Sequence, residues 1–207
     1  IARFDEASTG DASVVGALEK LWWPIARATY TVDPQGVDSR SEIAAELVRA
    51  NLLRAGAPGS NAYRMKTKWR QFLWEMFSAQ RFGVSVHEVV TRVQKGPLGT
   101  FRVINHLAWI HPSSIWQFRV DRDGFPLGIV QRFQARWWEG ERREDTEKSD
   151  WFEDFIPADQ LFFHVRKQEG SDLEGTAMVR GMYADAKRNQ AFRNWQAVHA
   201  QRVAVGI

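Results

Sequence analysis

The sequence contains no cysteine, so disulfide bonds and thiolate zinc sites are excluded for this chain. It also has no apolar run near the roughly 20 residues that a helix needs to cross a bilayer. The sequence also lacks a large excess of either charge, because 28 Lys and Arg residues against 25 Asp and Glu residues give a net charge of +3. That excess is too small to indicate nucleic-acid binding by itself.

The motifs of the common nucleotide-binding and hydrolytic families are missing too. There is no GxxxxGK(S/T) or GxGxxG loop, whose backbone amides would hold phosphates, and no GxSxG turn, which would expose a nucleophilic serine. These absences exclude P-loop ATPases, dinucleotide-binding dehydrogenases and hydrolases of those families. They leave open an enzyme with an irregular active site.

Histidine is the commonest metal ligand among side chains, and the chain has five. His106 and His111 are close in sequence, and His164 could approach them across a sheet. However, the HxH, HxxxH and HExxH spacings that place two imidazoles on one metal ion do not occur. We favour hydrogen-bonded histidines of strands and turns, and we expect no metal at these three residues and no cofactor.

Four aspartates allow an alternative in which two metal ions catalyse phosphodiester cleavage. They are Asp121, Asp123, Asp145 and Asp150. The Asp-Arg-Asp-Gly sequence at 121–124 is typical of a β-turn, and the mostly charged stretch 139–150 mixes both signs, as exposed loops do. We therefore favour a turn followed by an exposed excursion from the sheet.

Ten tryptophans are far more than a chain of this length usually has. Two pairs are adjacent in sequence, Trp22-Trp23 and Trp137-Trp138. Neighbouring side chains point to different sides of a strand or helix, so at least one member of each pair is hard to bury within one subunit. The pairs indicate either an interface with a partner or a core with two sides, and the sequence does not decide between them.

Apolar residues at helical spacing predict three N-terminal helices and a long C-terminal helix. Pro24 should end or kink the first helix, Ser39 with Glu42 forms a capping-box pattern before the second, and Gly83 suits the position after the third. The predicted helices cover residues 12–30, 40–55, 61–82 and 176–203.

The region between about 84 and 167 has the alternation of antiparallel strands, including a hairpin with its turn at Asp123-Gly124. Segregated helices and antiparallel strands indicate an α+β fold: N-terminal helices, an antiparallel β-rich middle and a long C-terminal helix. We expect an N-terminal arm and helix over 1–38 and one α+β domain over 39–207.

Five segments together resemble portal proteins of tailed bacteriophages, with a layout like that of the Mu-type branch. Each segment is short, but their order and spacing along roughly residues 40–207 are specific. They are FSAQRFGVSVHE at 77–88, LAWIHPSSI at 107–115, RVDRDG at 119–124, IPADQLFFH at 156–164 and EGSDLEGTAMVR at 169–180.

The resemblance implies a structural protein, not an enzyme. It implies a homo-oligomeric ring, usually of twelve subunits, at one capsid vertex of the virion, assembled in the host cytoplasm and not in a membrane. The implied partners are the major capsid protein, the terminase large subunit, a neck or adaptor protein, and the double-stranded DNA that passes through the channel. Residues 39–207 would be the outer wing domain, with stem, clip and crown expected beyond 207, so we expect the chain to be a segment of a longer protein.

A ring of this kind needs a contact between two different surfaces of neighbouring subunits. The helix predicted over 176–203 has apolar and arginine positions on more than one face, so we expect one face to pack on the sheet and another to meet a neighbour. The acidic loop 169–174 would be the partner surface. The predicted interface residues are Arg180, Tyr183, Arg188, Arg193 and Trp195 on the helix, and Glu169, Asp172 and Glu174 in the loop.

A rival hypothesis is a nucleic-acid-processing enzyme or DNA-binding protein. Basic residues on the third and last predicted helices could follow a phosphate backbone. Acidic residues are nearly as numerous as basic ones, so we favour solvated faces or ion pairs between subunits for these residues.

Overall fold

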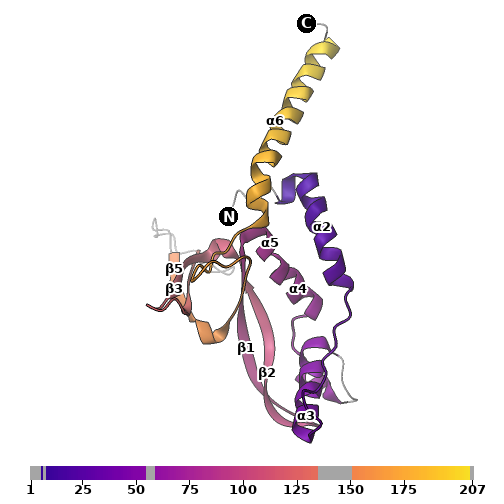
Figure 1. The fold of residues 1–207 in the computed structure, drawn as a ribbon, viewed down its shortest axis with the longest axis vertical. Helices are drawn as coiled ribbons and strands as arrows, with labels where there is room; N and C mark the ends of the chain where they lie inside the picture. Colours follow the sequence, from indigo (N-terminus) through magenta and orange to yellow (C-terminus); the bar gives the residue numbers. More distant parts are fainter. Residues whose placement is uncertain (1–5, 7, 55–58, 135–150, 206–207) are drawn as a thin grey trace, which may run out of the picture.

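The structure is a computed structural model that describes the chain except for residues 1–5, 7, 55–58, 135–150 and 206–207. Helices come first, strands occupy the middle, and a long helix follows them (Figure 1). The main elements are α2 (Ala12–Arg27), α3 (Ser39–Val48), π-helical η1 (Arg49–Leu53), 3-10 helix η2 (Ser60–Tyr63), α4 (Trp69–Phe77), α5 (Ala79–Phe82), β1 (Val84–Gly96), β2 (Gly99–Ile110), β3 (Ile115–Val120), β4 (Pro126–Gln134), β5 (Trp151–Pro157), β6 (Leu161–Val165) and α6 (Met178–Val205).

The strands form two three-stranded antiparallel sheets, with the orders β2-β1-β6 and β3-β4-β5. The β1–β2 hairpin is the longest pairing and runs from Val86↔Ile110 to Gly96↔Gly99, with one register shift after Val90. The predicted α+β fold is therefore confirmed. The predicted turn at Asp123-Gly124 joins β3 to β4, where Gly124 adopts a φ of +87°.

Aspartate side chains cap the N-termini of α2 and α3. The Asp11 carboxylate accepts hydrogen bonds from the N–H groups of Ser13 (2.9 Å) and Val14 (3.3 Å), and these bonds hold the pKa of Asp11 below its usual value. Asp38, not the predicted Ser39, caps α3 by accepting a bond of 2.8 Å from the Ser41 N–H. Pro24 does not end α2, which continues through it to Arg27, although its ring nitrogen cannot donate the bond to the carbonyl four residues earlier.

The single helix predicted over 61–82 is wrong in its first part. Residues 64–68 are not helical and run beside β2, where the Lys66 N–H donates to the Asn105 carbonyl (2.7 Å) and the Leu107 N–H donates to the Thr67 hydroxyl (3.1 Å). The buried Asn51 amide ties the same region together by donating to the carbonyls of Tyr63 (2.5 Å) and Ile104 (2.8 Å). These long-range hydrogen bonds outweigh the local helical pattern.

Strand β5 was not predicted, although it pairs with β4 from Gly128↔Pro157 to Gln134↔Trp151. Its sequence, WFEDFIP, lacks a regular alternation of apolar and polar residues, so the period of a half-buried strand is hidden. The excursion predicted at 139–150 lies outside the described residues, as do Trp137 and Trp138.

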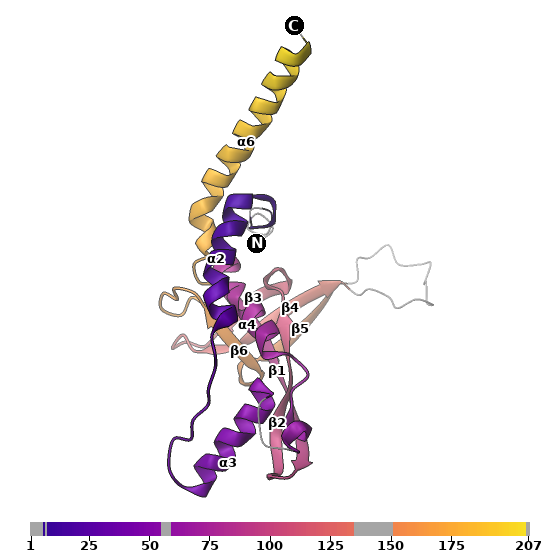
Figure 2. The same ribbon diagram turned by 90° about the vertical axis from the view of Figure 1, so that its right-hand side faces the viewer.

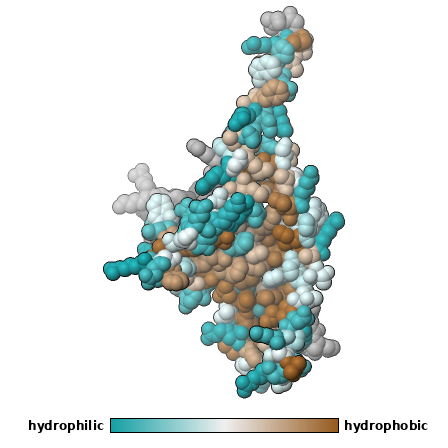
Figure 3. Space-filling model, in the orientation of Figure 1, coloured by the Kyte–Doolittle hydropathy of each residue, from teal (hydrophilic) through white to brown (hydrophobic). Residues whose placement is uncertain are grey.

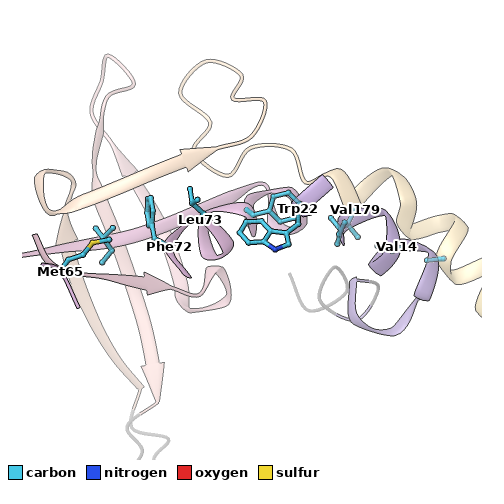
Figure 4. Packing of buried hydrophobic residues seen from close by; sticks show 10 residues of the cluster. Val14, Trp22, Met65, Phe72, Leu73 and Val179 are labelled. Carbon is cyan, nitrogen blue, oxygen red and sulfur yellow. The ribbon is translucent and has the colours of Figure 1, made fainter. Parts of the chain in front are cut away.

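The main core lies where α2, α4 and the start of α6 meet the β1–β2 hairpin (Figure 4). Its buried residues are Val14, Leu18, Trp22, Met65, Phe72, Leu73, Phe77, Leu107, Val179 and Ala186. A second cluster, which includes Val86, Ile129 and Ile156, lies between the two sheets. The core thus connects α2 directly to the base of α6, which extends away from the rest of the molecule in both views (Figures 1 and 2).

Candidate assembly interface

Two glycines set the point from which α6 departs. Gly83 ends α5 with a φ of +96°, and Gly175 precedes α6 with a φ of +61°. Their backbones face each other so closely that a β-carbon on Gly175 would lie 2.5 Å from the Gly83 carbonyl oxygen. Because both the left-handed backbone and the close approach require the absence of a side chain, only glycine fits at Gly175 without rearrangement.

Arg166 fastens this junction to the end of β6. Its Nε donates to Gln80 Oε1 (2.8 Å), and its Nη1 donates to the Thr176 carbonyl oxygen (2.7 Å). Its backbone N–H also donates to the Gly83 carbonyl (2.8 Å), and its own carbonyl accepts from the Thr176 N–H (2.9 Å). The orientation of α6 is therefore fixed by hydrogen bonds to two preceding elements.

The first part of α6 belongs to the body of the protein. Val179 is fully buried and Ala186 is nearly so, and both lie in the main core cluster. The helix packs chiefly against α5 and α2 and not, as predicted, against the sheet. In Figure 1, α6 follows the loop after β6 and leaves the body beside α5, with α2 next to its base.

The second part of α6 is not covered by any other described element, and Figure 3 shows apolar residues among hydrophilic ones along this projecting part. Every side chain from Arg188 to Ala204 is exposed, including Phe192 (56%) and Trp195 (61%). Phe192, Trp195 and His199 stack along the helix, with ring centroids 6.0 Å and 5.5 Å apart. At about 100° per residue, Trp195 lies about 180° around the axis from buried Ala186. This distal stripe, defined as Phe192, Trp195, Val198, His199 and Val203, is therefore not a continuation of the core-facing side.

The predicted interface residues of α6 fall into three groups. Arg188 and Trp195 are exposed in the second part of the helix, where Arg188 Nη1 lies 3.6 Å from Asp185 of the same helix. Tyr183 and Arg193 instead line a hollow beside the start of α2. Arg180 stands at the base of the helix, where it lines another hollow together with Glu174. The predicted set thus does not form a single face.

The acidic loop between β6 and α6 exposes all three predicted carboxylates, Glu169, Asp172 and Glu174. Leu173 anchors the loop by burying its side chain, and Ser171 contacts Gly124 of the β3–β4 turn. Asp172 partly serves the loop itself, because its carboxylate accepts from the Glu174 N–H at 2.8 Å. The charge contrast with α6 is clear, since no Asp or Glu follows Asp185 in that helix.

A second exposed aromatic surface lies where α2 passes α4; the sequence analysis noted its Trp22-Trp23 pair as a possible interface but not Trp74. Trp23 and Trp74 are each 48% exposed, whereas Trp22 is buried between them and the core. The adjacent pair Trp22-Trp23 thus has one buried and one exposed member, as the alternation of faces required. Trp74 lies outside the apolar stripe of its predicted helix, and that was the signal that could have revealed it.

A buried ionisable pair lies beneath α4. The His87 imidazole is fully buried on β1, with its Nε2 3.4 Å from Glu75 Oε2 and its ring edge-on to Phe72. Burial lowers the pKa of His87 to about 4 and raises the pKa of Glu75. His87 is consequently neutral at pH 7, and the contact is not an ion pair there. Neither residue was singled out from the sequence.

The candidate metal sites do not assemble in the part of the chain that the structure describes. No group of three or more His, Asp or Glu residues there could hold a metal ion. Asp121 serves the β3–β4 turn, because its Oδ1 accepts from the N–H groups of Asp123 (2.9 Å) and Phe125 (2.8 Å). Asp145 and Asp150 lie outside the described residues.

Among the described helices, none combines the length and apolarity that a membrane crossing requires.

Comparison with known proteins gives one match that spans nearly the whole chain. Residues 1–206 match the family described as "Portal protein of Mu bacteriophage". The match starts at residue 1, so it includes the N-terminal segment that the sequence resemblance, at roughly 40–207, left out. No curated protein matches the chain. Because the match extends over almost every residue, the chain belongs to the Mu-type family of phage portal proteins.

Proposed function

We propose that this chain is the wing part of a portal subunit that assembles, by family layout, into a closed ring of twelve subunits at one capsid vertex. Family membership makes it a structural component of a phage virion. In the proposed ring, the channel passes double-stranded DNA during packaging and ejection, and the assembly contacts the major capsid protein, the terminase large subunit and later a neck or adaptor protein. In this proposal the chain catalyses no reaction.

The observation that carries the proposal is the distal stripe on α6. An apolar face that is exposed on a projecting helix costs solubility and does not contribute to the subunit's own core. Such surfaces are normal where a partner covers them in an obligate assembly. A ring supplies a partner on each side of every subunit, by a heterologous contact that closes through rotation.

The proposed contact joins the second part of α6 to the acidic loop of a neighbouring subunit. Arg188 and Arg202 are exposed on the side of the helix that carries the distal stripe, and Glu169, Asp172 and Glu174 are exposed in the loop. Guanidinium groups pair with carboxylates in bidentate geometry and also stack on indoles, so the arginines and Trp195 suit one interface. Arg180 and Tyr183 would extend the contact at the base of the helix.

The ring is tested on the full-length protein by negative-stain electron microscopy and by size-exclusion chromatography with light scattering. Closed rings with a central hole, and no turnover of DNA with any divalent metal, are expected. A protein that stays monomeric at micromolar concentration, or that cleaves DNA, contradicts the proposal.

The contact is tested separately by Arg188→Glu and Trp195→Ala in the full-length protein. Both should reduce the yield of rings while the subunit stays folded. Gln201→Ala is the matched control, because Gln201 is equally exposed in α6 but lies away from the distal stripe. Rings that form at wild-type yield and salt sensitivity in both variants would show that this part of α6 is not an important contact.

A further inference from the structure

The exposed aromatic surface between α2 and α4 has the form of a groove, which we call the Trp74 groove. Trp74 stands at its centre, edge-on to Trp22 (centroids 4.9 Å apart) and stacked on Phe77 (6.1 Å). On one side of Trp74 is an open hollow of about 560 Å³, lined also by Trp22 and Trp23. On the other side is a hollow of about 340 Å³, whose apolar walls include Leu18 and Phe77. Both volumes lie in the range of about 300–1,000 Å³ that is typical of ligand sites.

The edge of the groove carries cations without acidic partners. Lys68 and Arg70 line the larger hollow and are exposed, and the Arg27 guanidinium lies 5.0 Å above the Trp23 ring. Within the described part of the chain, no carboxylate lies within ion-pair distance of any of these three residues. The groove therefore combines apolar hollows with positive charge along its border.

We propose that the Trp74 groove binds an acidic amphipathic helix of another protein. Apolar side chains spaced i and i+3 or i+4 on that helix would enter the two hollows on either side of Trp74. Its Asp and Glu residues would pair with Arg27, Lys68 and Arg70, which form no ion pair with a carboxylate among the described residues. This inference goes beyond the ring and does not depend on it.

The charges favour this occupant over two others. A nucleic acid carries phosphates along its whole length and would place charge against the apolar hollows, which Glu19 and Glu75 also line. An amphipathic helix can instead turn its apolar side chains toward the hollows and Glu19, and its acidic side chains toward the cationic edge alone. The α6 helix of a second copy would bring positive charge, because Lys187, Arg188, Arg193 and Arg202 follow its last acidic residue, Asp185. Like charges on the two surfaces oppose that contact.

The test is a selection from a random library of helix-forming peptides on the immobilised full-length protein, followed by fluorescence anisotropy with the enriched peptides. Enriched sequences should have two or three apolar residues at helical spacing, flanked by Asp and Glu. Trp23→Ser and the double variant Lys68→Glu/Arg70→Glu should each raise the dissociation constant at least tenfold. Trp116→Ser and Lys95→Glu, which alter a tryptophan that is 62% exposed and an exposed lysine elsewhere, should change the dissociation constant less than twofold.

Several results would overturn the inference. They are a selection without enrichment, enriched peptides that are basic or uncharged, and binding that Trp23→Ser and Lys68→Glu/Arg70→Glu leave unchanged. Tighter binding of a labelled oligonucleotide than of the peptides, lost in the same variants, would assign the groove to nucleic acid instead. Loss of rings in Trp23→Ser would assign it to a contact between copies. Rings that form normally while peptide binding is lost separate this inference from the proposed ring.

Discussion

The two parts of α6 have the same secondary structure but opposite surroundings. In the first part, Val179 and Ala186 are buried against α2 and α5, whereas in the second part even Trp195 is mostly exposed. Helices in proteins gain most of their stability from an apolar face that packs on other elements, so the first part is stabilised by the subunit itself. The apolar residues of the second part belong to none of the described core clusters, so the free energy of burying them, about 25 cal/mol per Å², is not gained within the described part of the subunit.

The largest difference between the two parts is expected for a charge placed on the apolar side chains. Val179→Asp puts a carboxylate in the main core and should lower the free energy of unfolding by about 4 kcal/mol. Val203→Asp makes the same change at a side chain that is 67% exposed, and should cost less than about 0.5 kcal/mol. Urea denaturation followed by circular dichroism measures both. Equal losses would mean that the second part of α6 is packed within the subunit.

The buried His87 makes the stability of the folded body depend on pH. The folded pKa of about 4 is below the usual 6.5, so the unfolded chain binds the proton more tightly between these values. Stability should therefore be complete above about pH 6.5 and fall by about 3 kcal/mol as the pH drops to 4. His87→Gln should flatten this slope in pH-dependent urea denaturation.

A variant of Glu75 tests whether this pH dependence of the free energy of unfolding comes from His87. The pKa of Glu75 is raised by burial, so its contribution has the opposite sign and stability rises as the pH falls through its folded pKa. Glu75→Gln should consequently make the loss of stability on acidification steeper. A pH dependence of the free energy of unfolding that is unchanged in His87→Gln would contradict its assignment to His87.

The junction between body and helix should respond to a single methyl group. In Gly175→Ala, the alanine would need a left-handed backbone and would place its β-carbon 2.5 Å from a carbonyl oxygen. The free energy of unfolding should fall by about 2 kcal/mol. Gly181→Ala, in α6 itself, meets no atom within 4 Å and should stabilise the protein by about 0.5–1 kcal/mol. Thermal unfolding would show opposite shifts of the melting temperature. A Gly175→Ala variant as stable as the wild type would mean that the junction can relax.

Local sequence patterns predicted the helices and hairpins whose own residues carry a regular apolar period. Apolar spacing located α2, α3, α6 and the β1–β2 and β3–β4 hairpins, because each of these has a regular period and a turn or cap nearby. The patterns failed at residues 61–68, where hydrogen bonds to Asn51, Asn105 and Leu107 come from residues far along the chain. They also failed at β5, whose irregular sequence is held by pairing with β4.

For the candidate interface, the sequence predicted which residue types α6 carries but not which of them lie on the same surface. The arginines and aromatics of α6 were visible in the sequence, but their division among three places was not, because the length of the packed part depends on where α2 and α5 lie. The Trp74 groove escaped for the same reason: its two sides come from helices about 50 residues apart in the sequence. Residue types can indicate a surface, but only tertiary packing decides which members share it.

The smallest expected effect on subunit stability comes from a tryptophan in the exposed second part of α6, and it can be compared with the same change at a buried tryptophan. Trp195→Ala should change the free energy of unfolding of the dilute subunit by less than about 0.5 kcal/mol, because no core residue covers the Trp195 ring. Trp22→Ala removes the same side chain from the core, where it is 8% exposed, and should cost about 3–5 kcal/mol. In an assembly assay on protein that remains folded, Trp195→Ala should reduce the yield of rings more than Trp22→Ala does. A loss of more than about 1 kcal/mol in the Trp195→Ala subunit would show that the stripe stabilises the subunit itself, and the inference that it is reserved for assembly would then fail.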